Sequence, residues 1–153
     1  MPRYIYMTTC LLLVLSACGG TKEVRQTVIP DNFQLSLERT MCFGRCPAYT
    51  LQVDDEGAIE YKAVRFAPEP KHVRSRLNTS QLRKLVYTLK QANMFQYEDS
   101  YDNPNVSDLP AVKLACTLEK GTKDIYLRMN TPAKLDSLVM NIEELVFRKM
   151  PSN

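Results

Sequence analysis

The sequence predicts an α+β fold in which an antiparallel β-sheet is covered on one face by two helices. Short segments that alternate apolar and polar residues, the period of a half-buried strand, occur in two groups. Each group is followed by a longer segment whose apolar residues recur with helical spacing. Because short turns join consecutive strands, the strands should pair antiparallel, and the helices should then cover one sheet face. The predicted order is ββ β(β) α ββ α.

The first group contains three strands and a shorter fourth. In the first strand, Phe33, Leu35 and Leu37 alternate with polar residues. The segment Asp54-Asp55-Glu56-Gly57 is a hairpin signal between the second strand and the third. The predicted strands cover residues 33–37, 49–53, 59–63 and 73–77.

A helix follows, and then a hairpin and a second helix. The first helix should begin at Asn78-Thr79-Ser80, with Thr79 or Ser80 as its cap, and end near Asn93. Residues 94–110 are expected to form a long acidic loop. The remaining predicted elements are strands over residues 111–118 and 124–129, turned at residues 120–122, and a helix from Thr131 with Pro132 at its first position.

The first twenty residues predict export. Arg3 is followed by an apolar run over residues 10–15 and then by Leu15-Ser16-Ala17-Cys18, the pattern of a secretory signal that ends in small residues. The cysteine at the cleavage site resembles the lipobox of bacterial lipoproteins, which implies cleavage before Cys18 and acylation of that residue. The apolar run is too short for a membrane-spanning helix, which needs about 20 apolar residues. We therefore expect a signal peptide over residues 1–17, a lipid-anchored tether over residues 18–32 and a single domain over residues 33–150.

The expected partner of the N-terminus is the membrane, reached through the lipid on Cys18. Gly19 stands where an aspartate would favour retention in the inner membrane, so we expect the outer membrane, facing the periplasm, if the host has two membranes. After cleavage the formal charge is +2, since residues 1–17 contain one basic residue and no acidic one. This charge is nearly neutral and the sequence contains no basic run, so we do not expect nucleic acid as a partner.

The cysteines of the domain predict one disulfide and one core thiol. Cys42 and Cys46 lie four residues apart, and in an oxidising exported compartment a disulfide between them is the default. The alternative is a thiol–disulfide redox protein that uses this pair, although the flanking segments are strands and Arg45 is the only nearby cation. Cys116 falls on the apolar face of a strand, where it should act as a small hydrophobic residue.

The sequence does not predict a metal site or a cofactor. Two cysteines and the single histidine, His72, are too few for zinc. Residues 98–108 offer several oxygen ligands suited to calcium but lack the EF-hand order, so turn capping is the simpler role. Within this loop, Asp108 should bond backbone amides and dock the loop.

The chain resembles the bacterial "domain of unknown function 6438" family. The resemblance rests on Cys42-Phe43-Gly44-Arg45-Cys46-Pro47-x-Tyr49, on Tyr61, on Asp108-Leu109-Pro110 and on the helix that opens at Pro132. It covers Phe33 to about Val146. Glu56-Gly57 departs from the Asp-Gly turn usual in the family. The resemblance implies an exported or lipid-anchored envelope protein and assigns no activity.

We expect an interaction module rather than an enzyme, because no catalytic set is assembled in the sequence. The expected partner is an envelope protein or polymer, bound at the Cys42–Cys46 turn or on the open sheet face. The candidate binding residues are Arg45, Tyr49, Tyr61 and Asp108.

Overall fold

The computed structural model describes residues 19–106 and 108–149, which contain three α-helices, one 3₁₀ helix and seven strands. In chain order the elements are α2 (Gly19–Gln26), β1 (Gln34–Arg39), β2 (Ala48–Asp54), β3 (Ala58–Arg65), β4 (His72–Arg76), α3 (Thr79–Ala92), η1 (Met94–Gln96), β5 (Ser100–Tyr101), β6 (Val112–Leu118), β7 (Gly121–Leu127) and α4 (Ala133–Phe147).

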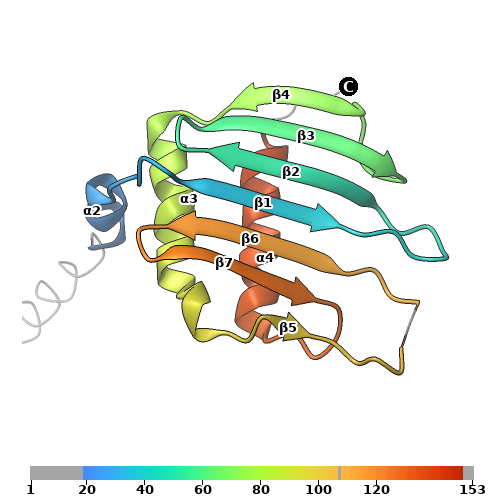
Figure 1. The fold of residues 1–153 in the computed structure, drawn as a ribbon. Helices are drawn as coiled ribbons and strands as arrows, with labels where there is room; N and C mark the ends of the chain where they lie inside the picture. Colours follow the sequence, from blue (N-terminus) through green and yellow to red (C-terminus); the bar gives the residue numbers. More distant parts are fainter. Residues whose placement is uncertain (1–18, 107, 150–153) are drawn as a thin grey trace, which may run out of the picture.

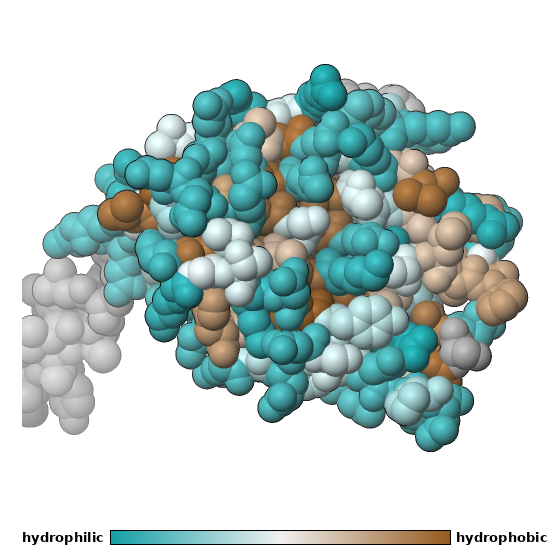
Figure 2. Space-filling model, in the orientation of Figure 1, coloured by the Kyte–Doolittle hydropathy of each residue, from teal (hydrophilic) through white to brown (hydrophobic). Residues whose placement is uncertain are grey.

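The strands form one open sheet in the order β4-β3-β2-β1-β6-β7-β5, and α3 and α4 lie side by side across one of its faces (Figure 1). All neighbouring strands pair antiparallel except β5, which runs parallel to β7. The predicted two-layer α+β fold is confirmed. Within residues 19–106 and 108–149, helices do not cover the other sheet face, and Figure 2 shows it mostly hydrophilic.

The core lies between the sheet and the two helices. Alternate strand residues such as Leu35, Leu37 and Leu51 point inward and are buried against apolar residues of α3 and α4. Cys116 belongs to this core, as predicted, and burial raises the pKa of its thiol to about 12. A thiol in this setting is protonated and shielded, so Cys116 has a packing role.

Several boundaries differ from the predicted ones. The N-cap of α3 is Asn78 rather than Thr79 or Ser80: its side chain accepts the Gln81 N–H, and the Gln81 side chain accepts the Asn78 N–H, each at 3.0 Å. This reciprocal pair is a capping box, which satisfies two backbone donors at once. The loop expected over residues 94–110 contains η1 and the short strand β5, and β7 begins at Gly121, next to its turn.

The segment expected as a tether also contains structure. Helix α2 covers residues 19–26 and contacts α3, where the Tyr87 hydroxyl donates to Glu23 Oε2 at 2.7 Å and Arg83 donates to the Arg25 carbonyl at 2.9 Å. Lys90 further donates to the Val28 carbonyl at 3.1 Å. The helix was missed because polar side chains hold it to α3, and such contacts leave no apolar stripe in the sequence.

The predicted signal peptide and Cys18 lie outside the described residues. Within residues 19–106 and 108–149, none of the helices has the length and apolar character needed to cross a bilayer.

Candidate functional site

The predicted disulfide between Cys42 and Cys46 is confirmed, and their Cα atoms are 5.8 Å apart. Both cysteines lie in the loop between β1 and β2, which Figure 1 shows extending beyond the ends of the strands. Inside the loop, the Gly44 N–H donates to Cys42 Sγ at 3.2 Å. Neither cysteine lies in a helix or immediately before one, so the helix N-terminus that lowers the thiol pKa in many redox enzymes is not supplied by the flanking chain.

Asp108 holds this loop from a distant part of the chain. Its Oδ1 accepts the Phe43 N–H at 2.9 Å, across 65 residues of sequence. Next to this contact, the Thr40 N–H donates to the Ala111 carbonyl at 2.9 Å, and the Ala111 N–H donates to Thr40 Oγ1 at 2.8 Å. The expectation that the Asp108 carboxylate bonds a backbone amide is met, and that amide belongs to the disulfide loop. Arg45 and Asp108 thus lie at the same end of the sheet.

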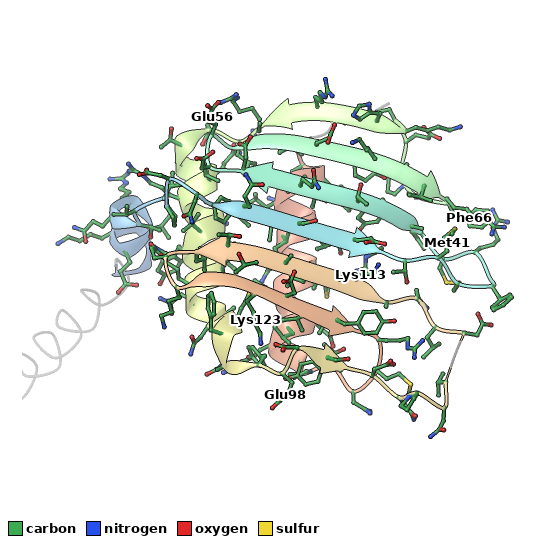
Figure 3. All side chains as sticks on the ribbon, viewed as in Figure 1. Met41, Glu56, Phe66, Glu98, Lys113 and Lys123 are labelled. Atoms are coloured by element: carbon green, nitrogen blue, oxygen red, sulfur yellow. A yellow bond between two sulfur atoms is a disulfide. The ribbon has the colours of Figure 1, made fainter. Side chains whose placement is uncertain are left out.

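Exposed apolar side chains gather at this end, which we call the tip and define as residues 41–46, 64–66 and 108–109. Phe43 is the most exposed of them, at 89%. Figure 2 shows a group of tan and brown side chains at the right-hand end of the sheet face, and Figure 3 labels Met41 and Phe66 at that end. Exposed apolar groups of this kind mark interaction surfaces. The large apolar residues exposed at the tip are Met41, Phe43, Val64, Phe66 and Leu109.

Two arginines stack on one aromatic ring of the tip. The guanidinium carbon of Arg45 lies 5.3 Å from the centroid of the Phe66 ring, and that of Arg65 lies 4.7 Å from it. Such cation–π contacts restrain long side chains that would otherwise sample many rotamers. Phe66 has a φ of 51°, in the left-handed region, as the chain leaves β3.

Tyr49 and Tyr61 are not on the surface, so their assignment to the binding surface was wrong. They are 3% and 0% exposed and face α4 from the inward side of β2 and β3. Their ring centroids are 5.5 Å apart, and each packs against Phe147 of α4, at 5.5 and 5.8 Å. A tyrosine hydroxyl can be satisfied inside a protein, as Tyr61 shows by donating to the Pro68 carbonyl at 2.8 Å.

A half-buried ionic cluster that the sequence analysis missed lies at the same end of the sheet as the tip, between strands and α4. Arg39 of β1 donates to the two Glu143 oxygens at 2.5 and 2.9 Å, and the Tyr49 hydroxyl donates to Glu143 Oε1. These hydrogen bonds to Glu143 hold the pKa of Arg39 above its usual range. Burial, followed by the bond to Glu143, raises the pKa of Tyr49. Each polar group has a partner within the cluster, so its evident role is to clamp β1 and β2 to α4.

The sequence contained a signal for this cluster. Arg39 continues the inward series of Leu35 and Leu37, and Glu143 follows Val139 by one helical turn on the buried side of α4. Opposite charges at two inward positions imply a pair, because an isolated buried charge is costly.

Alkaline conditions should weaken the fold through the two buried tyrosines. Burial, with a smaller effect of Glu69, raises the pKa of Tyr61 to about 12, and the pKa of Tyr49 is raised further. An unfolded tyrosine ionises near pH 10. The stabilisation is therefore complete below pH 10 and is lost as the pH rises toward the folded-state pKa values. Urea unfolding at pH 9 and pH 11 should show a smaller loss for Tyr61→Phe than for the unaltered protein. An equal loss in both proteins would contradict this assignment.

The chain matches a known family over most of its length. A family model described as a domain of unknown function, DUF6438, matches residues 33–146. The chain belongs to the DUF6438 family. Among curated proteins, the comparison found no match. The matched region begins just before β1 and ends within α4, so the DUF6438 domain comprises the whole sheet, both covering helices and the tip.

The acidic loop of the DUF6438 domain is held by ion pairs. Asp99 pairs with Lys123, and Asp102 pairs with Arg128, which lowers the pKa of the Asp102 carboxyl. In the described residues of the chain, acidic, histidine and cysteine side chains do not gather in threes around a common point that could hold a metal ion.

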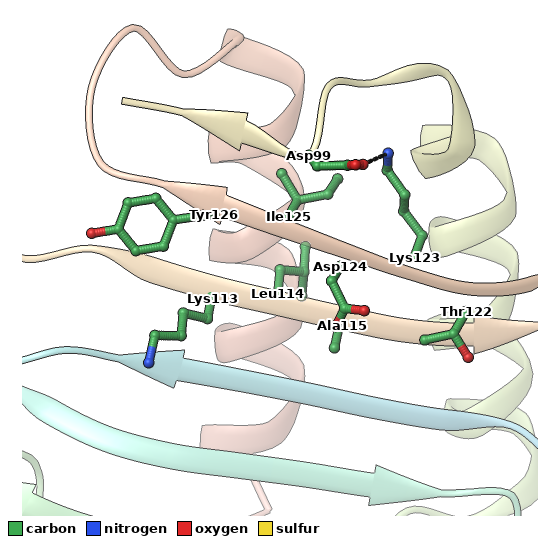
Figure 4. Close-up of a pocket in the computed structure, with 9 residues that line it drawn as sticks. All are labelled: Asp99, Lys113, Leu114, Ala115, Thr122, Lys123, Asp124, Ile125 and Tyr126. Carbon is green, nitrogen blue, oxygen red and sulfur yellow. Dashed lines mark hydrogen bonds and ion pairs between the residues drawn. The ribbon is translucent and has the colours of Figure 1, made fainter. Parts of the chain in front are cut away.

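The open face of the DUF6438 domain contains a shallow pocket of about 420 Å³ on β6 and β7 (Figure 4). Ala115, the small residue between the Lys113 and Thr117 positions of β6, lines its floor, and Asp124 and Tyr126 of β7 border it. The Lys113 ammonium pairs with Glu38 of the neighbouring strand β1. Its charged residues Lys113 and Lys123 are paired with Glu38 and Asp99, and the pocket is an open depression of the sheet surface rather than the enclosed cleft typical of a small-molecule site.

Proposed function

We propose that this DUF6438 protein is a lipid-anchored bacterial envelope protein that acts as a protein-binding module rather than an enzyme, with the tip as its binding surface. The observation that carries this proposal is the gathering of five large exposed apolar side chains at one end of the sheet. Aromatic residues, methionine and arginine are the residue types enriched in protein interfaces, and the tip combines all three.

The loop that carries Phe43 is also braced for binding. The disulfide closes it, and Asp108 bonds its backbone from a second loop. A surface held in its binding shape loses less conformational entropy when a partner docks, so more of the contact energy appears as affinity.

With an anchor on Cys18, the tip would face away from the membrane. Residue 19 begins α2, which lies at the left end of the sheet in Figure 1, and the tip lies at the right end. Lipid on Cys18 would therefore anchor the chain at the end opposite the tip. In a host with two membranes, we propose the outer membrane as the site of anchoring, with the domain in the periplasm.

The anchor has a direct test with a matched control. Cells that express the full chain are fed an alkyne analogue of palmitate, and the protein is isolated and coupled to a fluorophore. Cys18→Ser should abolish labelling and release the protein from the membrane fraction, because only Cys18 receives lipid. Cys10→Ser, in the segment removed with the signal, should label normally. Labelling that survives Cys18→Ser would refute the proposed anchor.

The binding surface is tested by photo-crosslinking in intact cells. A photoreactive phenylalanine analogue replaces Phe43 in one variant and Met140 in another. Met140 is a suitable control because it is an exposed apolar residue of α4, 66% accessible and outside the tip. A protein adduct is expected from position 43 and not from position 140. Adducts of equal yield from both positions, or adducts from neither, would refute the tip as the binding surface.

A further inference from the structure

Among the described residues, the two tip arginines are positive charges without an acidic partner. Arg45 and Arg65 both stack on Phe66, and neither forms an ion pair in the described part of the chain, whereas Arg39 and Arg128 do. Two guanidinium groups held on one ring repel each other. A carboxylate bound beside this ring would reduce that repulsion and could accept hydrogen bonds from the guanidinium groups.

The neighbouring carboxylate of the tip is already engaged. Asp108 points its Oδ1 to the Phe43 N–H and serves to hold the loop. The loops at this end, residues 41–46, 64–71 and 108–109, contain Arg45, Arg65 and Lys71 against Glu69 and Asp108, which leaves an excess of positive charge.

The positive groups stand beside apolar ones. Phe43 and Met41 precede Arg45 in the loop, and Val64 precedes Arg65 at the end of β3. When a partner covers the apolar side chains and excludes water, the effective dielectric constant around the arginines falls and their attraction for an anion increases. Arginine suits such a position, because its planar group binds a carboxylate through two parallel hydrogen bonds and stacks on an aromatic ring at the same time.

We infer that the tip recognises an acidic segment of a partner protein, in which a carboxylate pairs with Arg45 and Arg65 and an adjacent apolar side chain packs against Phe43. This inference rests on the proposed function of the tip. We assign the anion to a protein carboxylate rather than to lipid phosphate, because the tip lies at the end of the domain opposite the proposed anchor.

The test extends the crosslinking from position 43. It compares the parent protein with Arg45→Gln/Arg65→Gln and with Arg74→Gln/Arg76→Gln, which removes the same charge from exposed arginines of β4. The tip double variant should lower the adduct yield at least tenfold, and the β4 double variant should leave it unchanged. Mass spectrometry of the adduct should place an aspartate or glutamate within a few residues of the crosslinked position. Thermal unfolding of each purified variant verifies that the tip substitutions leave the domain folded.

A charge exchange then tests the pair directly. Replacement of the identified partner carboxylate by lysine should abolish the adduct, and Arg65→Glu in the DUF6438 protein should restore it. Unchanged adduct yield in Arg45→Gln/Arg65→Gln would overturn this inference while leaving the tip as a binding surface. Adducts to phospholipid alone would overturn it in favour of a membrane, and the lack of any adduct from position 43 would overturn both proposals.

Discussion

Glu143→Gln is expected to lower the free energy of unfolding by about 2–3 kcal/mol, a large part of the stability of a domain of this size. The carboxylate is only 13% exposed and receives hydrogen bonds from Arg39 and Tyr49. Glutamine can accept from one donor but does not balance the charge of a half-buried guanidinium. The expected loss of stability is no larger than the smallest losses seen when one partner of a fully buried ion pair is removed, because Arg39 remains about one third exposed.

The adjacent residue provides the control. Glu144 pairs with Arg148 on the solvent side of α4, and both side chains are exposed. Surface pairs of this type contribute less than about 1 kcal/mol, so Glu144→Gln should change the unfolding free energy by about 0.5 kcal/mol or less. Urea denaturation of the two variants, measured at the same pH, gives the comparison. Equal losses would mean that the Arg39–Glu143 pair does not clamp the strands to α4.

The main strands and helices were predictable because their periodicity reflects burial directly. Leu35, Leu37 and Leu51 alternate in the sequence and lie in one core in the structure. The same logic fails for β5, since two residues are too few to show a period of two. It also predicted Thr79 or Ser80 as the helix cap instead of Asn78, because all three residue types cap helices well and only the geometry of Gln81 decides.

The candidate site was predictable only in part. The Cys42–Cys46 disulfide follows from spacing, and the exposure of Arg45 follows from its place in a turn. Tyr49 and Tyr61 were assigned to the binding surface, although their inward register with Leu51 and Ile59 already placed them in the core. Tyrosine is ambiguous in this respect, since it is an apolar ring with one polar atom.

The assembly of the tip was beyond sequence reasoning. It joins three loops, and the contacts between them, Asp108 with Phe43 and Arg45 with Phe66, span 65 and 21 residues of sequence. Such contacts depend on the sheet order, in which β6 lies beside β1 although six elements separate them in the chain. Local patterns predict neither that order nor which loops meet at one end.

Glycine is required at position 57 for both a local and a tertiary reason, and its substitution should cause a second large loss of stability. The turn between β2 and β3 requires a glycine locally, because residue 57 has a φ of 76°. The structure adds a close approach: a Cβ at this position would lie 2.9 Å from the Leu77 carbonyl oxygen, while the Leu77 N–H donates to the Gly57 carbonyl at 2.9 Å. Gly57→Ala should therefore cost about 3 kcal/mol, from the left-handed backbone and the steric contact together.

The substitution Gly57→Asn separates the cost of the left-handed backbone from the cost of the steric contact. It tolerates the left-handed region far better than alanine, yet it carries the same Cβ toward Leu77. If the close approach dominates, Gly57→Asn and Gly57→Ala should show nearly equal losses in urea denaturation. Recovery of most of the stability by asparagine would instead assign the cost to the backbone angle. We expect the two losses to be nearly equal, because the atom that the Cβ meets is a backbone oxygen of Leu77. The N–H of that same residue is bonded to the Gly57 carbonyl, so the Leu77 backbone cannot move away without weakening this hydrogen bond.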